Sequence, residues 1–222
     1  MKYPLLIIAF NRPEILLKLL SSLSIEQLKN RRIYFAVDGA RSKSERLKVQ
    51  KVETVIKKFT HSNDLNATYY FSKTNKGCKI SVSEAITKVL NSNDAAIILE
   101  DDCIPSVSFL PYCDELLDKH KNDSHIMMIN GTTFVEGQCG SSTHRLSKCA
   151  IVWGWATWAR AWNNYDVKMS DYQINSDTIK QRILAYFGKY GVNINKLISA
   201  VQNDRVDTWD AQWVYSLWRQ SN

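Results

Sequence analysis

The stretch Ala95-Ala-Ile-Ile-Leu-Glu-Asp-Asp-Cys-Ile-Pro105 decides the fold, because an apolar run of five residues ends in three consecutive carboxylates. A short, unbroken apolar run is typical of a buried strand. Such a strand would carry Glu100, Asp101 and Asp102 to the carboxyl edge of a sheet, where open α/β folds bind ligands. The alternative interpretation is a solvated turn that precedes a helix.

Three adjacent carboxylates repel one another, and this repulsion keeps a proton on at least one of them unless a cation compensates the charge. Carboxylate oxygens are the ligands that Mg²⁺ and Mn²⁺ prefer. The acidic cluster therefore predicts a divalent-metal site at the tip of the strand, with Mn²⁺ or Mg²⁺ as the cofactor.

Strand and helix patterns alternate through the first 120 residues. The predicted strands are four apolar runs, at residues 5–10, 33–37, 68–71 and 95–99. Each is followed by apolar residues at helical spacing. This alternation is typical of a doubly wound, mainly parallel sheet with helices on both faces. Downstream, the sequence predicts one more strand, one mobile loop and two helical segments, at residues 126–129, 136–142, 176–190 and 194–202.

The 222-residue length, with 45% hydrophobic and 23% charged residues, fits a single globular domain. Residues 1–130 carry the pattern of a nucleotide-binding fold. Residues 131–222 hold all seven tryptophans, and we expect this part to be mainly helical.

The net charge is +7, and the Lys and Arg residues are spread along the chain. This distribution favours phosphate or acidic lipid over nucleic acid as the anionic partner. The five cysteines include no Cys-x-x-Cys pair, so neither a disulfide framework nor a zinc site is indicated. No apolar stretch approaches the roughly 18 residues of a membrane span. We therefore expect a cytoplasmic protein that associates, if at all, peripherally with the inner face of the membrane.

Polar residues follow the first two predicted strands at their carboxyl ends. Asn11 and Arg12 follow the first, and Asp38-Gly39 follows the second. Because these ends meet in a parallel sheet, Arg12 is expected to contact a phosphate and Asp38 a base or ribose. The plainer interpretations are a surface cation and a turn. Residues 9–13 contain no glycine, which disfavours dinucleotide-binding and P-loop sites.

Two tryptophan-rich segments are candidates for the acceptor half, Trp153-Gly-Trp-Ala-Thr-Trp158 and Thr208-Trp-Asp-Ala-Gln-Trp213. Flat indole rings with a polar edge suit stacking on sugar rings, although the same residues also fit a buried core. Asp210 stands beside two tryptophans, where apolar surroundings can raise the pKa of a carboxyl toward that of a general base. A surface Asp near a helix start is the other interpretation.

Taken together, these residues resemble nucleotide-sugar glycosyltransferases of the GT-A fold, specifically the β-1,2-N-acetylglucosaminyltransferase-like group and its bacterial relatives. The resemblance covers most of the chain. It rests on six segments: Ile7-Ile-Ala-Phe-Asn-Arg12, Val37-Asp38, Asn75-Lys-Gly77, Glu100-Asp-Asp102 as a form of the Asp-x-Asp motif, Val152-Trp-Gly-Trp155 and Trp209-Asp210.

The resemblance implies roles for these residues. Asp102 would bind Mn²⁺ on the nucleotide diphosphate, and Asp210 would be the catalytic base of an inverting transfer. Arg12 would touch the nucleotide, Asp38 the base, and Glu100 with Asp101 the ribose or donor sugar. The implied nucleotide-sugar site consists of Asn11, Arg12, Asp38, Asn75, Gly77, Glu100, Asp101 and Trp155.

The activity implied by the resemblance is transfer of a sugar, with a UDP-sugar as donor, to a glycan or glycolipid acceptor in surface polysaccharide or glycolipid synthesis. Residues 1–130 would bind the donor, and residues 131–222 the acceptor. Two departures stand out: Asn75 replaces a nucleotide-contacting histidine of some relatives, and the chain ends soon after Asp210, as a shortened form would. The alternatives are a non-catalytic nucleotide-sugar or carbohydrate-binding module and a sugar-phosphate nucleotidyltransferase.

Overall fold

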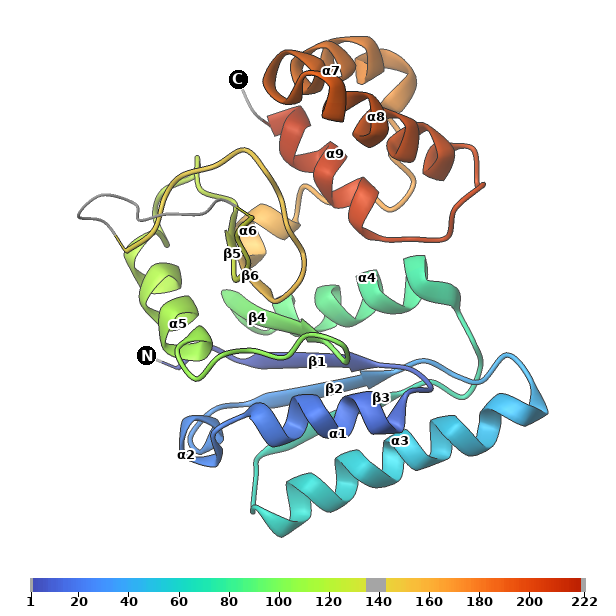
Figure 1. Cartoon of the computed structure of the whole chain (residues 1–222), viewed down its shortest axis with the longest axis vertical. Helices are drawn as coiled ribbons and strands as arrows, with labels where there is room; N and C mark the ends of the chain where they lie inside the picture. The colour runs from blue at the N-terminus through green and yellow to red at the C-terminus, as the bar shows by residue number, and fades with distance from the viewer. Residues whose placement is uncertain (1, 135–142, 221–222) are drawn as a thin grey trace.

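The computed structural model describes residues 2–134 and 143–220 (Figure 1). The loop predicted at 136–142 lies outside the described residues. The strands are β1 Leu5–Ala9, β2 Ile33–Val37, β3 Ala67–Phe71, β4 Ala95–Glu100, β5 Met128–Asn130 and β6 Trp155–Trp158. The helices are α1 Pro13–Ser22, α2 Ile25–Leu28, α3 Lys43–Ser62, α4 Gly77–Leu90, α5 Phe109–Lys119, α6 Ala159–Trp162, α7 Tyr172–Phe187, α8 Lys189–Gln202 and α9 Asp210–Gln220.

The described strands form one mixed sheet in the order β3-β2-β1-β4-β6-β5. Strands β1 to β4 run parallel, as the alternation of strand and helix patterns predicts. Strand β6 pairs antiparallel with both β4 and β5. The α/β class with a mainly parallel sheet is therefore confirmed, with an antiparallel addition at one edge.

Helices cover both faces of the sheet because successive residues of the central strand point to opposite sides. Leu5 and Ile7 of β1 pack in the cluster that includes α1, α3 and α5. Leu6 and Ile8 pack on the other face, in the cluster that includes α4 and the start of α9. Figure 1 shows α1 and α3 on one side of the sheet and α4 on the other.

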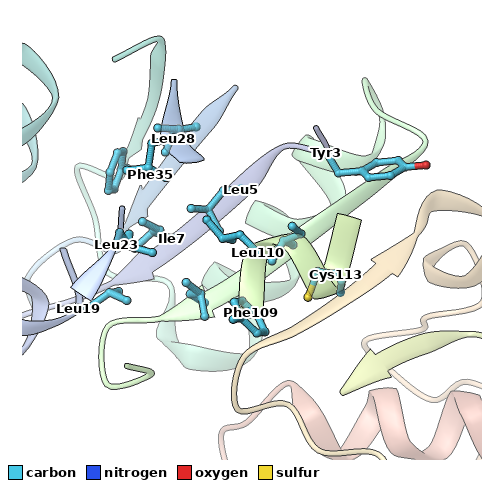
Figure 2. Close-up of a cluster of buried hydrophobic side chains, with 14 of the residues drawn as sticks. Tyr3, Leu5, Ile7, Leu19, Leu23, Leu28, Phe35, Phe109, Leu110 and Cys113 are labelled. Carbon is cyan, nitrogen blue, oxygen red and sulfur yellow. The ribbon is translucent and has the colours of Figure 1, made fainter. Parts of the chain in front are cut away.

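The first of these clusters contains the largest number of side chains and holds the N-terminal half together. Figure 2 shows Leu5 of β1 lying close to Leu110 of α5, and Ile7 of β1 lying close to Leu23. The labelled aliphatic side chains are at most a few per cent exposed, apart from Leu23 at 7%. This packing fixes the strands whose carboxyl ends carry the candidate site.

The three C-terminal helices α7, α8 and α9 form a separate lobe above the sheet in Figure 1. Its core is a third cluster that includes Ile183 of α7, Ile198 of α8 and Tyr215 of α9. Helix α9 also contributes Trp213 to the second cluster, which contains side chains of the sheet and of α4, so α9 joins the lobe to the sheet. The helical, tryptophan-rich character expected of the C-terminal part is confirmed.

One short element, strand β6, differs from the helical character expected of the C-terminal part. Trp155, Trp158 and Trp162 stand at helical spacing, yet the first two belong to strand β6 and only Trp162 lies in a helix. All four residues of β6 are buried, and a fully buried short segment has no polar alternation by which a strand can be distinguished from a helix.

Among the described residues no helix is both long and apolar enough to cross a membrane.

Candidate functional site

The carboxyl ends of the four parallel strands lie level with one another. Ala9 at the end of β1 is in register with Val37 of β2, which is in register with Phe71 of β3. On the other side of β1, Ile8 is in register with Glu100 at the end of β4. The polar residues that follow these strands therefore meet at one edge of the sheet, as expected.

Arg12 binds the acidic tip of β4 directly. Its guanidinium donates to both oxygens of Asp101 and, at 3.1 Å, to Oδ2 of Asp102. Asp101 is 2% exposed, so it depends on this ion pair, whereas Asp102 remains 53% exposed. The cation that compensates these two acids is thus supplied by the chain itself, and Asp101 has no accessible surface for the ribose contact expected of it.

Glu100 points to the opposite face of the sheet, toward the start of α9. Burial and the neighbouring Asp102 carboxylate raise the pKa of Glu100 to about 7, and a hydrogen bond from the Trp209 side chain acts in the other direction. The charges of Asp101 and Asp210 raise it further. The structure therefore places Asp210 in the electrostatic neighbourhood of the acidic tip, although the two lie far apart in the sequence.

Asp38 holds two turns together at this edge. Its carboxylate accepts hydrogen bonds from the backbone N–H groups of Gly39, Lys76 and Gly77 and from Nδ2 of Asn75. The side chain is 7% exposed. Both oxygens are thus engaged by the protein, and the interpretation of Asp38-Gly39 as a turn is the one that the geometry supports. Asp38 therefore shapes the edge through its carboxylate, and Asn75 through its Nδ2, which donates to Asp38 and to Gly39.

Gly39 allows the second and third strand ends to approach. A Cβ atom there would lie 2.4 Å from the backbone carbon of Thr74, so no other residue fits without moving the β3–α4 turn. Asn75 in that turn also donates to the carbonyl oxygen of Gly39 at 2.8 Å. This close contact fixes the position of the amino end of α4.

Asp207 occupies the amino end of α4. Its carboxylate accepts hydrogen bonds from the N–H groups of Cys78 at 2.9 Å and Lys79 at 3.0 Å. The Lys79 ammonium also binds Asp204 at 2.8 Å. The segment that leads into Asp210 is therefore tied to the parallel-strand part of the chain by a charge-assisted cap, which the sequence does not reveal because the spacing of Asp207 forms no motif.

Asp210 is the first residue of α9 and is partly exposed. Its Oδ1 accepts from the Thr208 hydroxyl and, at 2.8 Å, from the N–H of Ala211. The phenol of Tyr165 donates to the carbonyl oxygen of the preceding Trp209 at 3.1 Å. Asp210 thus stands at a helix start, as one of the two interpretations expected.

Asn11 belongs to the periphery of the site. Its Nδ2 donates to Oε1 of Glu45 at 3.0 Å. Glu45 also binds Arg41, and this ion pair lowers the pKa of Glu45 to about 2. Asn11 therefore connects the end of β1 to the start of α3.

Trp155 is part of the core. It is 0% exposed, and its ring stacks on that of Trp209 with the centroids 5.5 Å apart. A ring without an exposed face cannot stack on a sugar, so the structure corrects the assignment of Trp155 to the nucleotide-sugar site. Trp155 is buried because its side chain points to the face of the sheet that α4 and α9 cover, where it is in register with Ile98.

The fit of a divalent cation depends on Asp102. Within the described part of the chain, no group of three or more His, Cys, Asp or Glu side chains is arranged to hold a metal by itself. A cation bound through one carboxylate and the phosphates of a substrate requires no such group. Asp102 is exposed, and the contact of its Oδ1 is a weak one with the Cys103 thiol at 4.0 Å. The hard oxygen donor and the acidic surroundings fit Mn²⁺ or Mg²⁺.

Three solved structures resemble this chain at low identity. TarS of S. aureus, residues 1–349, aligns with a TM-score of 0.47 and 13% identity over 72% of this chain and 47% of TarS. A cytidylyltransferase from Leptospira borgpetersenii gives 0.43 and 13% over 81% and 73%. The 4-diphosphocytidyl-2C-methyl-D-erythritolsynthase of Anaerococcus prevotii gives 0.39 and 12% over 80% and 85%.

This chain therefore spans about half the length of the TarS chain that it matches. No family model matches the sequence, and no curated protein matches it. Likenesses of this strength carry no argument about activity, and the functional conclusion rests on the site.

Proposed function

We propose that this chain transfers a sugar from a nucleotide-diphosphate donor, with UDP as the nucleotide, to a hydroxyl of a glycan or glycolipid. The observation that carries the proposal is the arrangement of Asp102 and Glu100 at the end of β4 with Asp210 at the start of α9. The charges of Asp102 and Asp210 both act on Glu100. A metal-binding carboxylate and a second carboxylate across the same edge are the two groups that an inverting transfer requires.

On the donor side, Asp102 would hold the cation and Arg12 would orient Asp102. A divalent cation bound there would offset the charge that develops on the departing diphosphate. Arg12 uses part of its guanidinium on Asp101 and Asp102 and is 42% exposed, so N–H groups remain for a phosphate oxygen. Glu100, Asn75 and Gly77 border the same edge.

On the acceptor side, Asp210 would remove the proton of the attacking hydroxyl. The acceptor oxygen forms a bond to the anomeric carbon, the bond from that carbon to the diphosphate oxygen breaks, and the bonding electrons leave with the nucleotide. One such displacement inverts the anomeric centre. The hydrogen bonds to Oδ1 from Thr208 and Ala211 orient the carboxylate, and a general base of this kind contributes about 10²- to 10⁴-fold.

A groove in the C-terminal lobe supports work at an anionic membrane face. Three of its lining residues are cationic, Lys180, Lys196 and Arg205, and it has a volume of about 480 Å³. Residues 178–203 contain four Lys or Arg and no Asp or Glu. Leu184 and Val192 of the lining are about 40% exposed. Cations beside apolar side chains suit the surface of an anionic bilayer, where a lipid-linked acceptor would lie.

The experiment that tests the proposal is incubation of the protein with a panel of UDP-sugars and Mn²⁺. We expect slow release of UDP by hydrolysis in the absence of acceptor and saturable binding in a thermal-shift assay. Binding without release, with or without added saccharides, would identify a non-catalytic module instead. Release of pyrophosphate from UTP and a sugar phosphate would identify a nucleotidyltransferase.

A further inference from the structure

One tryptophan of the seven stands apart from the core. Trp153 is 60% exposed, and all seven tryptophans lie within the described residues. The other six are buried, with at most 4% of each exposed: Trp155, Trp158, Trp162, Trp209, Trp213 and Trp218. The exposed indole is not isolated, because the neighbouring ring of Phe134 is exposed as well, and adjoining exposed apolar side chains mark binding surfaces.

Trp153 lies at the same edge of the sheet as the acidic tip. Strands β4 and β6 are antiparallel, and Trp155 at the start of β6 is in register with Ile98 of β4. The residues before Trp155 therefore continue past the carboxyl end of β4, where Glu100 and Asp102 lie. The contacts of Gly154 agree with this placement, because its Cβ position lies 3.3 Å from the side chain of Leu99, the residue before Glu100.

The backbone that carries Trp153 is held firmly. The Thr132 hydroxyl donates to the carbonyl oxygen of Trp153, and the Gly131 N–H donates to that of Gly154, each at 2.8 Å. Gly154 has a φ of +71°, and a Cβ there would meet Leu99 at 3.3 Å. A glycine at this position lets the chain turn out of β6 and project the indole away from the core.

A second aromatic ring completes the surface. Phe134 is 69% exposed and lies edge-to-face with Trp153, with ring centroids 5.6 Å apart. The pair offers a flat apolar face and a raised edge. Such surfaces recognise the C–H face of a pyranose ring, while the indole N–H can serve a sugar hydroxyl.

We propose that Trp153 and Phe134 form a platform on which a sugar ring of the acceptor saccharide stacks, beside Asp102 and Glu100. This inference rests on the proposed transferase function and adds to it the surface that recognises the acceptor. It also replaces Trp155 as the stacking tryptophan, since only Trp153 has an exposed face. The ligand of this platform is a saccharide, and its ring binds beside the acidic tip of β4.

The exposed position of Trp153 provides a direct optical test. Iodide should quench the fluorescence of the parent protein and should have little access to the six buried rings, so Trp153→Phe should lose most of the quenchable signal. Chitobiose, cellobiose, lactose and maltose are the probes, each added at millimolar concentration. We expect at least one to protect the parent from iodide, and Trp153→Ala to bind it at least roughly fivefold more weakly, by saturation-transfer NMR.

Three controls separate the possible failures. Trp153→Phe keeps an aromatic ring and should retain part of the saccharide affinity, whereas Ile174→Ala removes an even more exposed apolar side chain of α7 and should change nothing. Binding of UDP with Mn²⁺ should be the same in all variants. If UDP and Mn²⁺ bind but no probe binds, or if Trp153→Ala binds as the parent does, the platform is wrong. If UDP does not bind the parent protein, the proposed transferase function is wrong, and the platform that rests on it is wrong as well.

Discussion

The guanidinium of Arg12 sets the charge balance at the tip of β4. It pairs with Asp101, whose carboxylate is 2% exposed, and leaves Asp102 at the surface. Removing the arginine therefore leaves a buried acid without its partner. The free energy lost when a buried polar group is unpaired is about 1–3 kcal/mol.

Arg12→Ala should lower the free energy of unfolding in urea by about that amount, 1–3 kcal/mol. Asp101→Asn in the same background should recover part of the loss, because it removes the unpaired charge. Nucleotide affinity measured in the double variant then reports any phosphate contact separately from stability. Equal stability of Arg12→Ala and the parent would show that the ion pair contributes nothing.

Asp102 allows a closely matched metal test. It is 53% exposed and accepts from Arg12 at 3.1 Å, while Asp118 of α5 is 56% exposed and accepts from Lys121 at 3.1 Å. UDP should raise the melting temperature more with Mn²⁺ than with EDTA. Asp102→Asn should remove that difference, and Asp118→Asn should preserve it. A nucleotide that binds the parent equally well in EDTA would rule out the metal role of Asp102.

At the scale of elements, the amino end of α4 organises the site. Two carboxylates from distant segments, Asp38 and Asp207, accept its first N–H groups. Gly77 begins the helix with a φ of +80°, and a Cβ there would lie 2.6 Å from Oδ2 of Asp207. The turn, the helix start and the segment before Asp210 are thus mutually dependent.

Gly77→Ala should displace the Asp207 carboxylate as well as strain the backbone. Gly188→Ala is its control, since Gly188 also has a positive φ but no atom of the described residues near its Cβ position. We expect Gly77→Ala to lose roughly 1 kcal/mol or more beyond Gly188→Ala, the scale of an overpacking penalty. Hydrogen exchange should accelerate at the amides of Cys78 and Lys79 only in Gly77→Ala. Unchanged exchange there would show that Asp207 does not cap α4.

The sequence predicts the parallel strands and their helices because each strand is an apolar run followed by a helical stripe, as in β1 with α1. For the same reason it predicts that the carboxyl ends of the parallel strands lie level with one another. It does not predict β6, whose four buried residues fit a helix equally well. Nor does it predict which polar groups turn inward. Asp38 and Asp101 look like ligand contacts in the sequence, and only the tertiary structure shows that Gly39, Lys76 and Arg12 already engage them.

At the scale of the whole molecule, the lobe of α7, α8 and α9 contains a cationic groove. Helix α9 joins this lobe to the candidate site. Within the described residues, neither Lys196 nor Arg205 forms an ion pair, whereas Lys180 lies 3.6 Å from Asp177. Cations without acidic partners retain their full attraction for an anionic surface.

The protein should sediment together with vesicles that contain phosphatidylglycerol, and it should not sediment with neutral phosphatidylcholine vesicles. Lys196→Ala should weaken this binding roughly fivefold, the factor that corresponds to about 1 kcal/mol for each cation near a charged membrane. Lys51→Ala removes an exposed cation of α3 and serves as the control. Salt should weaken the binding as well. Equal losses in both variants would show that net charge, and not the groove, is responsible.

The central claim is that Asp210 and the acidic tip of β4 form one catalytic site. The measurement that tests it most directly is the rate of UDP release from a UDP-sugar by Asp210→Asn, compared with its affinity for UDP and Mn²⁺. The account predicts donor affinity close to that of the parent and a rate lower by about 10²- to 10⁴-fold. A folded variant that turns over at the parental rate would contradict it.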